Sequence, residues 1–343
     1  MMKSSGQKGV DAEEALRGYF RSIGYFVLRG VPFVYKRNDI TDVDLWLYVK
    51  ATPLAAERSC VDVKRRKTPQ AMERVLWTRG LKEVLGVERA IVVTSDNRLE
   101  TREFGATNGV EILQGALLQY VINTHTGRDR LTEEELFEIL KQGCIIDPRV
   151  DWRAWFRRAK SRLLDSLDFD GCNSFLLSIK FLLNEYVATG RTSEVSVRLL
   201  YLIIAYLLIC LDYTSRSCVS LDLEGRVLAL TDGFRYGEAG RNRTEEIVKM
   251  AMQLLAEAGK ADLTLRDTLR HEFDKQVLEY RAEILGEHFA KTESLLNLFP
   301  TARLFEDMAY AKTLTSPNGA PPEQKAIIGL LCDFLQHDRK GIL

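Results

Sequence analysis

Three charged side chains stand at the ends of two apolar stretches. Asp44 opens the stretch "DLWLYVK", while Asp62 and Lys64 close the stretch "SCVDVK". Because side chains alternate along a strand, Asp62 and Lys64 share one face, and Val61 and Val63 point to the other face. Burying a charge without a partner is strongly unfavourable, so a ligand that binds all three groups would explain their placement.

Divalent metal chemistry on a phosphate ester suits such a trio. Mg²⁺ prefers oxygen ligands and is held by one or two carboxylates together with waters and substrate phosphate. If the two stretches pair as antiparallel strands through the loop at 51–58, Asp44 approaches Asp62 and Lys64 at one end of a sheet. A metal there would lower the pKa of its bound water and neutralise the phosphorane, while the lysine would hold a phosphate oxygen or orient the water.

Some of these assignments have alternatives close by in the sequence. Acid-x-Lys is a weak motif, since chance gives about two or three in a chain of this composition, and residues 338–340 form another. A slip of register by two residues would put Asp42 in the place of Asp44. Glu13, on the first predicted helix, would add a carboxylate, but Glu14 competes for that role, and an acid in a first turn also favours the helix dipole.

Basic residues follow the trio closely. The run "KRRK" begins at Lys64, and more basic residues lie on the next predicted helix. The net charge of the whole chain is zero, but residues 1–125 hold 19 Lys and Arg against 15 Asp and Glu, a net charge of +4. A basic surface suits a phosphate backbone, although adjacent charges on an exposed turn are also common without function. The residues that we expect to contact nucleic acid are Arg65, Arg66, Lys67, Arg74 and Arg79.

The elements that must position these residues alternate between helix and strand up to about residue 125. Helical spacing of apolar residues predicts a first helix over 11–23, which Gly24 ends. Runs of β-branched and aromatic residues predict strands at 25–30, 31–36, 43–50 and 59–64. Pro69 starts a helix that ends near Gly86, followed by a strand at 89–95, a helix at 99–108, a strand at 110–113 and a helix at 115–122. This order predicts an α/β (α+β) domain with a mixed central sheet flanked by helices.

The pattern becomes helical after residue 125. Strand-like alternation nearly disappears, and no proline occurs between Pro148 and Pro300. Predicted helices cover 131–142, 150–168, 171–189, 192–213, 242–258, 264–290 and 322–338. We therefore expect two domains, one over residues 1–125 and an all-α domain over residues 126–343.

Composition and residue usage exclude several classes of protein. The longest apolar run, at 199–211, has 13 residues, which suits a core helix and is too short to span a bilayer. The amino-terminal residues lack the apolar region of a secretory signal, and the six cysteines form no CxxC pair, so we expect a cytoplasmic protein. The four histidines have no paired ligand spacing, which argues against zinc. Trp152 and Trp155 would either stack on bases or, as such pairs more often do, pack a helix into the core.

Three segments, taken in order, resemble the PD-(D/E)xK nuclease superfamily, especially Mrr-type restriction endonucleases and Holliday-junction resolvases. In those proteins a helix glutamate comes about eleven residues before a glycine–aromatic pair, which matches Glu13 with Gly24 and Tyr25. Their acid–hydrophobic–Asp strand matches residues 42–44, and their (D/E)xK strand matches residues 62–64. The resemblance continues through "RAIVVTSDNRLETREFGATNGVEILQGALL" and spans about residues 8–120.

The resemblance implies a restriction-endonuclease-like fold and a metal-dependent endonuclease that hydrolyses DNA phosphodiester bonds. The residues that it assigns to catalysis are Glu13, Asp44, Asp62, Lys64 and Gln70, and those that it assigns to Mg²⁺, or to Mn²⁺ in its place, are Asp44, Asp62 and the carbonyl of Val63. The superfamily usually has Glu or Gln where this chain has Asp62, a shorter side chain that shifts the metal. Gln70 falls where many relatives carry a site glutamine, but a polar residue at a helix start needs no function.

The same resemblance suggests a role in restriction, anti-phage defence or repair. A protein with one metal site per chain usually needs two copies, or two successive cuts, to cleave both DNA strands. We therefore expect a homo-oligomer. RNA is an alternative substrate, because nothing in the sequence reads or excludes a 2′-hydroxyl. A second hypothesis keeps the fold without catalysis: a subunit that binds nucleic acid or a partner ATPase. In both, the helical domain would serve recognition, partner binding or assembly.

Overall fold

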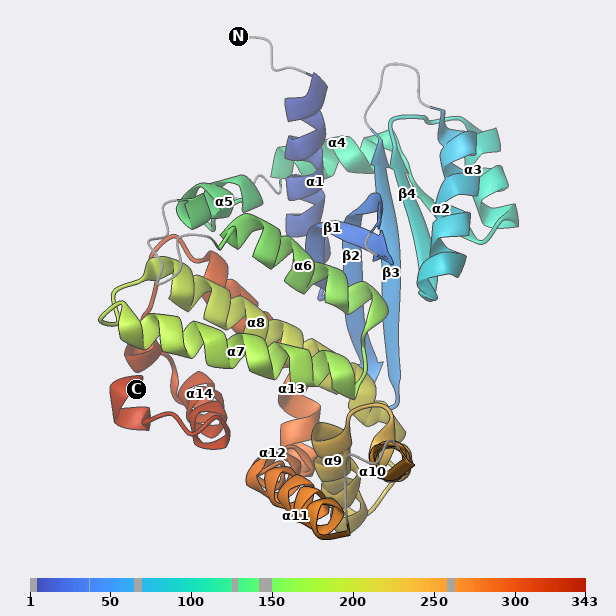
Figure 1. Cartoon of the computed structure of the whole chain (residues 1–343). Coiled ribbons are helices and arrows are strands. Elements are labelled where there is room, and N and C mark those ends of the chain that lie inside the picture. Colours follow the sequence, from blue (N-terminus) through green and yellow to red (C-terminus); the bar gives the residue numbers. More distant parts are fainter. Residues whose placement is uncertain (1–4, 37, 65–69, 125–128, 142–149, 258–262) are drawn as a thin grey trace.

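The computed structural model describes residues 5–36, 38–64, 70–124, 129–141, 150–257 and 263–343. A five-stranded mixed sheet with flanking helices forms the amino-terminal part, and the rest of the described chain is helical (Figure 1). The predicted order, an α+β part followed by a helical part, is therefore confirmed.

The sheet has the strand order β1-β2-β3-β4-β5. Its strands are β1 (Phe26–Tyr35), β2 (Asn38–Thr52), β3 (Ala55–Lys64), β4 (Arg89–Thr94) and β5 (Val110–Leu113). The first three pair antiparallel, and β3, β4 and β5 pair parallel. The parallel strands are connected through α2 (Ala71–Leu85) and α3 (Leu99–Thr107).

Two expectations about the strands are wrong. The segments at 25–30 and 31–36 form one strand, because β1 pairs with β2 on both sides of Gly30, whose φ is +55°. The residues at 51–58 are not a long loop, since β2 and β3 extend to Thr52 and Ala55. This extension lacks apolar alternation, but its charged residues form ion pairs. Arg58, for example, pairs with Glu88 at 2.8 Å.

Alternation along β2 gives the sheet two buried faces. Leu45 and Leu47 pack with α1 (Ser5–Ser22) and α4 (Gly115–Thr124), as do Val61 and Val63 of β3. Trp46 and Tyr48 point to the opposite face, into a larger core that includes the carboxyl-terminal helices.

The helical part contains helices that the sequence predicts and two that it does not. They are α5 (Glu133–Lys141), α6 (Trp152–Asp165), α7 (Phe169–Ala188), α8 (Glu194–Thr214), α9 (Leu223–Tyr236), α10 (Gly240–Glu257), α11 (Leu263–Glu279), α12 (Glu283–Phe289), α13 (Thr292–Tyr310) and α14 (Pro322–Phe334). The predictions missed α9 and α13 and joined α11 to α12. Helix α13 continues through Pro300 because its apolar side chains, such as Phe305, are buried in the core, which offsets the lost backbone hydrogen bond.

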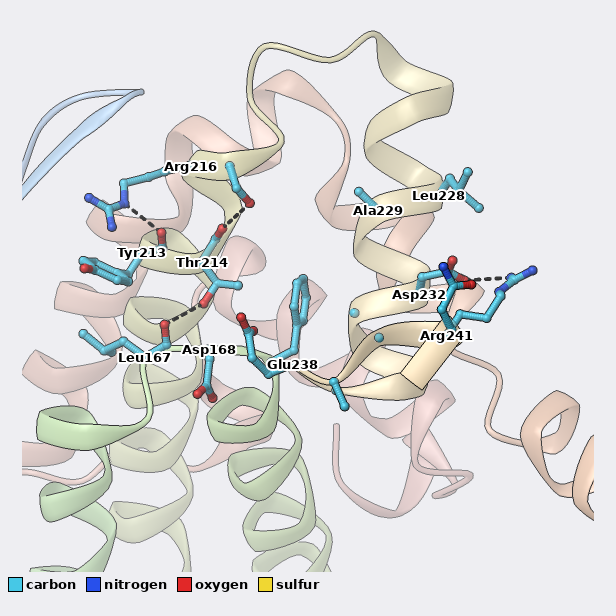
Figure 2. Close-up of a pocket in the computed structure, with 17 residues that line it drawn as sticks. Leu167, Asp168, Tyr213, Thr214, Arg216, Leu228, Ala229, Asp232, Glu238 and Arg241 are labelled. Carbon is cyan, nitrogen blue, oxygen red and sulfur yellow. Dashed lines mark hydrogen bonds and ion pairs between the residues drawn. The ribbon is translucent and has the colours of Figure 1, made fainter. Parts of the chain in front are cut away.

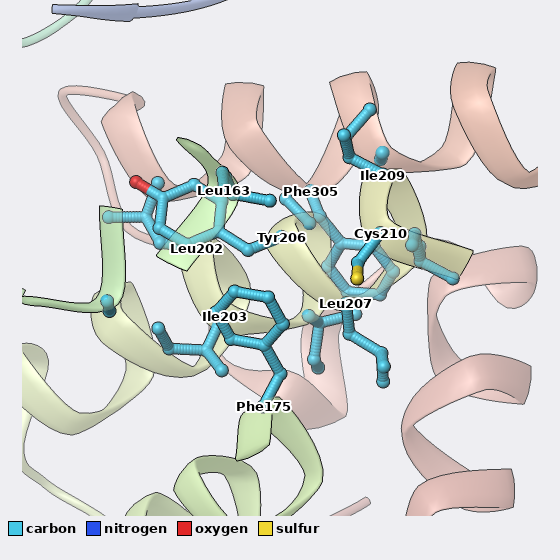
Figure 3. Packing of buried hydrophobic residues seen from close by; sticks show 14 of the residues in the cluster. Leu163, Phe175, Leu202, Ile203, Tyr206, Leu207, Ile209, Cys210 and Phe305 are labelled. Atoms are coloured by element: carbon cyan, nitrogen blue, oxygen red, sulfur yellow. The ribbon is translucent and has the colours of Figure 1, made fainter. Parts of the chain in front are cut away.

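Helix α8 lies at the centre of the helical part. Every residue from Val195 to Asp212 is buried, and Phe175 of α7, Leu163 of α6 and Phe305 of α13 surround its side chains (Figure 3). Among the described residues, the segment Glu194–Ser217 is the one that length and composition would allow to cross a membrane. Its most apolar window is 94% buried inside the structure, as is typical of the core helix of a soluble protein.

The two tryptophans of α6 follow the core alternative. Trp152 is 3% exposed, and its ring stacks on that of Phe181 with centroids 5.7 Å apart. Trp155 packs beside both of these rings. The base-stacking interpretation of this pair is therefore not supported by their position.

Buried ion pairs join the sheet part to the helical part. Arg17 of α1 donates to Glu306 of α13 at 2.7 Å, and Arg130 donates to the same carboxylate. A buried hydrogen bond also links the two parts: the Lys160 ammonium of α6 donates to the Arg29 carbonyl of β1 at 2.6 Å. Residues 125–128 lie outside the described residues, and the division into two domains at 125 stays a prediction.

We expect Glu306 to make stability depend on acid. Burial raises its pKa, but Arg130 and Arg17 outweigh that effect and hold the pKa at about 2, against an ordinary value of 4.5. A lowered folded-state pKa gives stability that is present above pH 4.5 and is lost as pH falls from there towards 2. Because roughly two and a half pKa units correspond to about 3 kcal/mol, Glu306→Gln should lower the free energy of unfolding at pH 7 by about that amount.

Urea denaturation at pH 7, 4.5 and 3 checks this expectation. The wild-type free energy of unfolding should fall over this range by more than that of Glu306→Gln. Glu293→Gln, at an exposed position of the same helix, is the matched control and should follow wild type. Parallel curves for wild type and Glu306→Gln would contradict the role of the buried pair.

Candidate active site

Asp44, which lies within β2 and not near its start, meets Asp62, which lies near the end of β3. Leu45 of β2 pairs with Val61 of β3, so Asp44 lies beside Asp62 at the next position of the antiparallel pair. The amide of Val63 donates a hydrogen bond to Asp44 Oδ2 at 2.7 Å. The predicted antiparallel pairing of these strands is confirmed, and it places both carboxylates at one end of the β2–β3 ladder.

Lys64 lies between the two carboxylates. Its Nζ is 3.7 Å from Asp44 Oδ2 and 3.6 Å from Asp62 Oδ1. The Lys64 side chain is 30% exposed, against 20% for Asp44 and 8% for Asp62. The lysine therefore forms the solvent-accessible rim of a site whose floor is acidic.

Burial raises the pKa of the Asp44 carboxyl, and the charge of Asp62 adds to the rise, while Lys64 and the Val63 amide oppose it. Because Lys64 lies within 4 Å of both acids and Arg74 also contacts Asp62, the two negative charges are partly compensated.

Glu13 lies on α1 and is held beside the site by Arg29. The Arg29 guanidinium donates to Glu13 Oε2 at 3.1 Å and also contacts Glu14 and Glu134. Burial raises the pKa of Glu13, and the negative charge of Asp44 adds to the rise. Glu14 accepts hydrogen bonds from two arginines, Arg29 and Arg17. We therefore assign Glu13, whose pKa responds to Asp44, to the site.

Arg74 of α2 is part of the site. Its Nε donates to Asp62 Oδ2 at 2.9 Å, and its NH2 donates to Asp62 Oδ1. The guanidinium thus forms a two-pronged ion pair with the carboxylate, the strongest geometry available to these groups. The structure places this predicted nucleic-acid contact on a site carboxylate.

Within the described part of the chain, no hydrogen bond or ion pair links Asp44 or Asp62 to Gln70, Arg79 or Asp42. Gln70 is exposed at the cap position before α2 and makes no side-chain cap hydrogen bond. Arg79 donates to Asn108 Oδ1 at 2.8 Å, at the end of α3, so the structure does not bring it to the carboxylates. Asp42 is 50% exposed and pairs with Arg157 of α6, which leaves Asp44 as the site acid of β2. The predicted contacts Arg65, Arg66 and Lys67 lie outside the described residues.

One residue near the site was not predicted. Trp77 is 45% exposed, and the guanidinium carbon of Arg74 lies 5.6 Å from its ring centroid. The sequence could have indicated Trp77, because it lies three residues after Arg74 on a predicted helix and such residues share one helix face. An exposed aromatic ring beside charged groups suits stacking on a nucleobase.

The donor set fits a hard divalent cation, with one condition. Two carboxylates from neighbouring strands, with a lysine at their rim, are groups suited to Mg²⁺ and a phosphate. No cluster of three or more His, Cys, Asp or Glu suited to a metal occurs within the described ranges, so the inner ligands from side chains would be Asp44 and Asp62. The condition is that Arg74 leaves Asp62, whose two oxygens it contacts.

A cavity of about 780 Å³ lies in the helical part, between the α6–α7 junction, the end of α8 and α9–α10 (Figure 2). Several of its charged groups already have partners. Arg241 pairs with Asp232 at 2.9 Å, the Arg216 guanidinium covers the Tyr213 ring at 3.6 Å, and Asp168 caps α7.

Comparisons of the chain with protein-family models, with curated proteins and with solved structures give no match. Function must therefore be argued from the side chains of the site.

We expect the site lysine to be removable without unfolding the protein. Lys64 is 30% exposed and its two ion pairs are long, so Lys64→Gln should cost under about 1 kcal/mol. Arg29 is 8% exposed and contacts three carboxylates, so Arg29→Met should cost about 3 kcal/mol or more. Thermal unfolding followed by circular dichroism checks both variants, and equal losses of stability would contradict the comparison.

Proposed function

We propose that the chain is a metal-dependent nuclease with a restriction-endonuclease-like fold of the PD-(D/E)xK type, and that it hydrolyses phosphodiester bonds of DNA. The observation that carries the proposal is the meeting of Asp44, Asp62 and Lys64 on the adjacent strands β2 and β3. The order of a helix, three antiparallel strands, a helix and a parallel strand supports it, because the sequence resemblance implies this arrangement.

Each side chain has a role that follows from its position. Asp44, Asp62 and the carbonyl of Val63 would hold the metal. When bound, Mg²⁺ or Mn²⁺ supplies a water of lowered pKa and neutralises charge on the phosphoryl group. Lys64, at the exposed rim, reaches a phosphate oxygen or orients the attacking water. Glu13, fixed by Arg29, adds negative charge beside Asp44.

A role in restriction or anti-phage defence, in the cytoplasm, and assembly into a homo-oligomer extend the same proposal. On α10, Ile247, Met250 and Leu254 follow one another at spacings of three and four residues, and each is more than half exposed. Such a stripe suits packing against another helix. The helical part would therefore supply the assembly or partner surface.

A second candidate is a nuclease-fold subunit without catalysis, which binds nucleic acid or a partner ATPase. One observation favours it: the two oxygens of Asp62 are engaged by Arg74. If this ion pair were permanent, a metal could not use Asp62.

Cleavage of supercoiled plasmid tests the two candidates. The wild-type chain should nick DNA in Mg²⁺ or Mn²⁺ and leave it intact in EDTA. Lys64→Gln and Asp44→Asn should lower the rate by about a hundredfold or more, the loss typical of a group that acts on the reacting water or phosphate.

Asp42→Asn is the matched control, because Asp42 lies two residues from Asp44 on the same strand but pairs with Arg157. It should cut like wild type. If the chain binds metal but neither nicks plasmid nor cleaves matched DNA and RNA oligonucleotides, the second candidate is favoured. If it cleaves only the RNA oligonucleotide, the substrate is RNA and not DNA.

A further inference from the structure

The ion pair between Arg74 and Asp62 is the most closely fitted contact of the site. Asp62 is 8% exposed and Arg74 is 25% exposed, so the pair lies at the boundary between the core and solvent. Nε and NH2 of the guanidinium reach one carboxylate oxygen each. A planar guanidinium matches a carboxylate in this way, and it matches a phosphate group equally well.

Arg74 and a divalent cation compete for the same oxygens. A metal held by Asp62 would share these oxygens with the guanidinium, and two positive groups on one carboxylate repel each other. Lys64 Nζ, at 3.6 Å from Asp62 Oδ1, adds a further positive charge. The Arg74–Asp62 pair therefore weakens metal binding at Asp62.

The surroundings of Arg74 offer it another place. Trp77, one turn along α2, is 45% exposed and lies within cation–π distance of the guanidinium. The ring offers the guanidinium a second contact that does not involve Asp62. Because both side chains are partly exposed, a phosphate of the nucleic-acid backbone would reach a guanidinium that has left Asp62.

We propose that Arg74 is a positioning residue that exchanges between Asp62 and a backbone phosphate, so that nucleic acid and divalent metal bind this chain cooperatively. The inference rests on the proposed nuclease function for the identity of the phosphate. Without nucleic acid, Arg74 neutralises Asp62 and weakens metal binding. With nucleic acid, Arg74 holds the phosphate, and Asp62 is free for the metal. Coupling between two ligands is reciprocal, so the metal must also strengthen nucleic-acid binding.

Calorimetric titration of Mn²⁺ into the full-length chain tests this exchange without relying on cleavage. A short phosphorothioate duplex serves as the nucleic acid, because it keeps its charge and resists hydrolysis. Wild type should bind Mn²⁺ about tenfold more tightly, or better, when the duplex is saturating. Arg74→Ala should show the tighter binding already without the duplex and gain little from it.

Lys82→Ala is the matched control, since it removes one positive charge from the last turn of the same helix, eight residues after Arg74, and it should behave like wild type. Arg74→Lys keeps the charge but loses the two-pronged contact, so it should also bind Mn²⁺ more tightly than wild type without the duplex. This second variant keeps the test valid if Arg74→Ala unfolds.

The outcomes separate the two proposals. If Asp62→Ala abolishes Mn²⁺ binding but both Arg74 variants bind and respond to the duplex like wild type, the exchange is overturned and the metal site survives. If Mn²⁺ binds neither wild type nor the Arg74 variants, with or without the duplex, the metal site itself is wrong and the exchange falls with it.

Discussion

Buried positive charges that need carboxylates from distant segments constrain the whole molecule. Arg17 is 3% exposed and relies on Glu306, while Arg29 is 8% exposed and relies on Glu134 in addition to Glu13. A buried charge that loses its partner costs several kcal/mol, so α1 and β1 are stable only with α5 and α13 docked against them. Because Arg29 also fixes Glu13, the geometry of the candidate site depends on the same docking.

The sheet imposes a second constraint, which comes from β2. A strand with Trp46 and Tyr48 on one face and Leu45 and Leu47 on the other requires cover on both faces. The helical part supplies one of these covers: Tyr48 donates to the buried Asp212 of α8 at 2.5 Å. The sheet and the carboxyl-terminal helices therefore share a core, and helices far along the chain stabilise the strands that carry the site.

Local patterns in the sequence predict the helices and strands around the site well, because helix spacing, β-branched runs and stop signals are short-range. They miss α13, because Pro300 argues against a helix there and the burial that stabilises it cannot be read locally. They predict a loop at 51–58, because the ion-pair partners of its charged residues lie on segments distant in sequence. Asp44, Asp62 and Lys64 were found from strand alternation. The partner of Arg74 and the exposure of Trp77 were not, since both depend on how α2 lies against β3.

The central position of α8 has a consequence for synthesis of the protein. Trp46 and Tyr48 emerge from the ribosome early, but α8 and α13, which cover them, end about 170 and 260 residues later. At typical rates of translation, that delay amounts to roughly ten to fifty seconds. During this time the aromatic face of the nascent sheet lacks its own cover and is exposed to aggregation until the helices arrive.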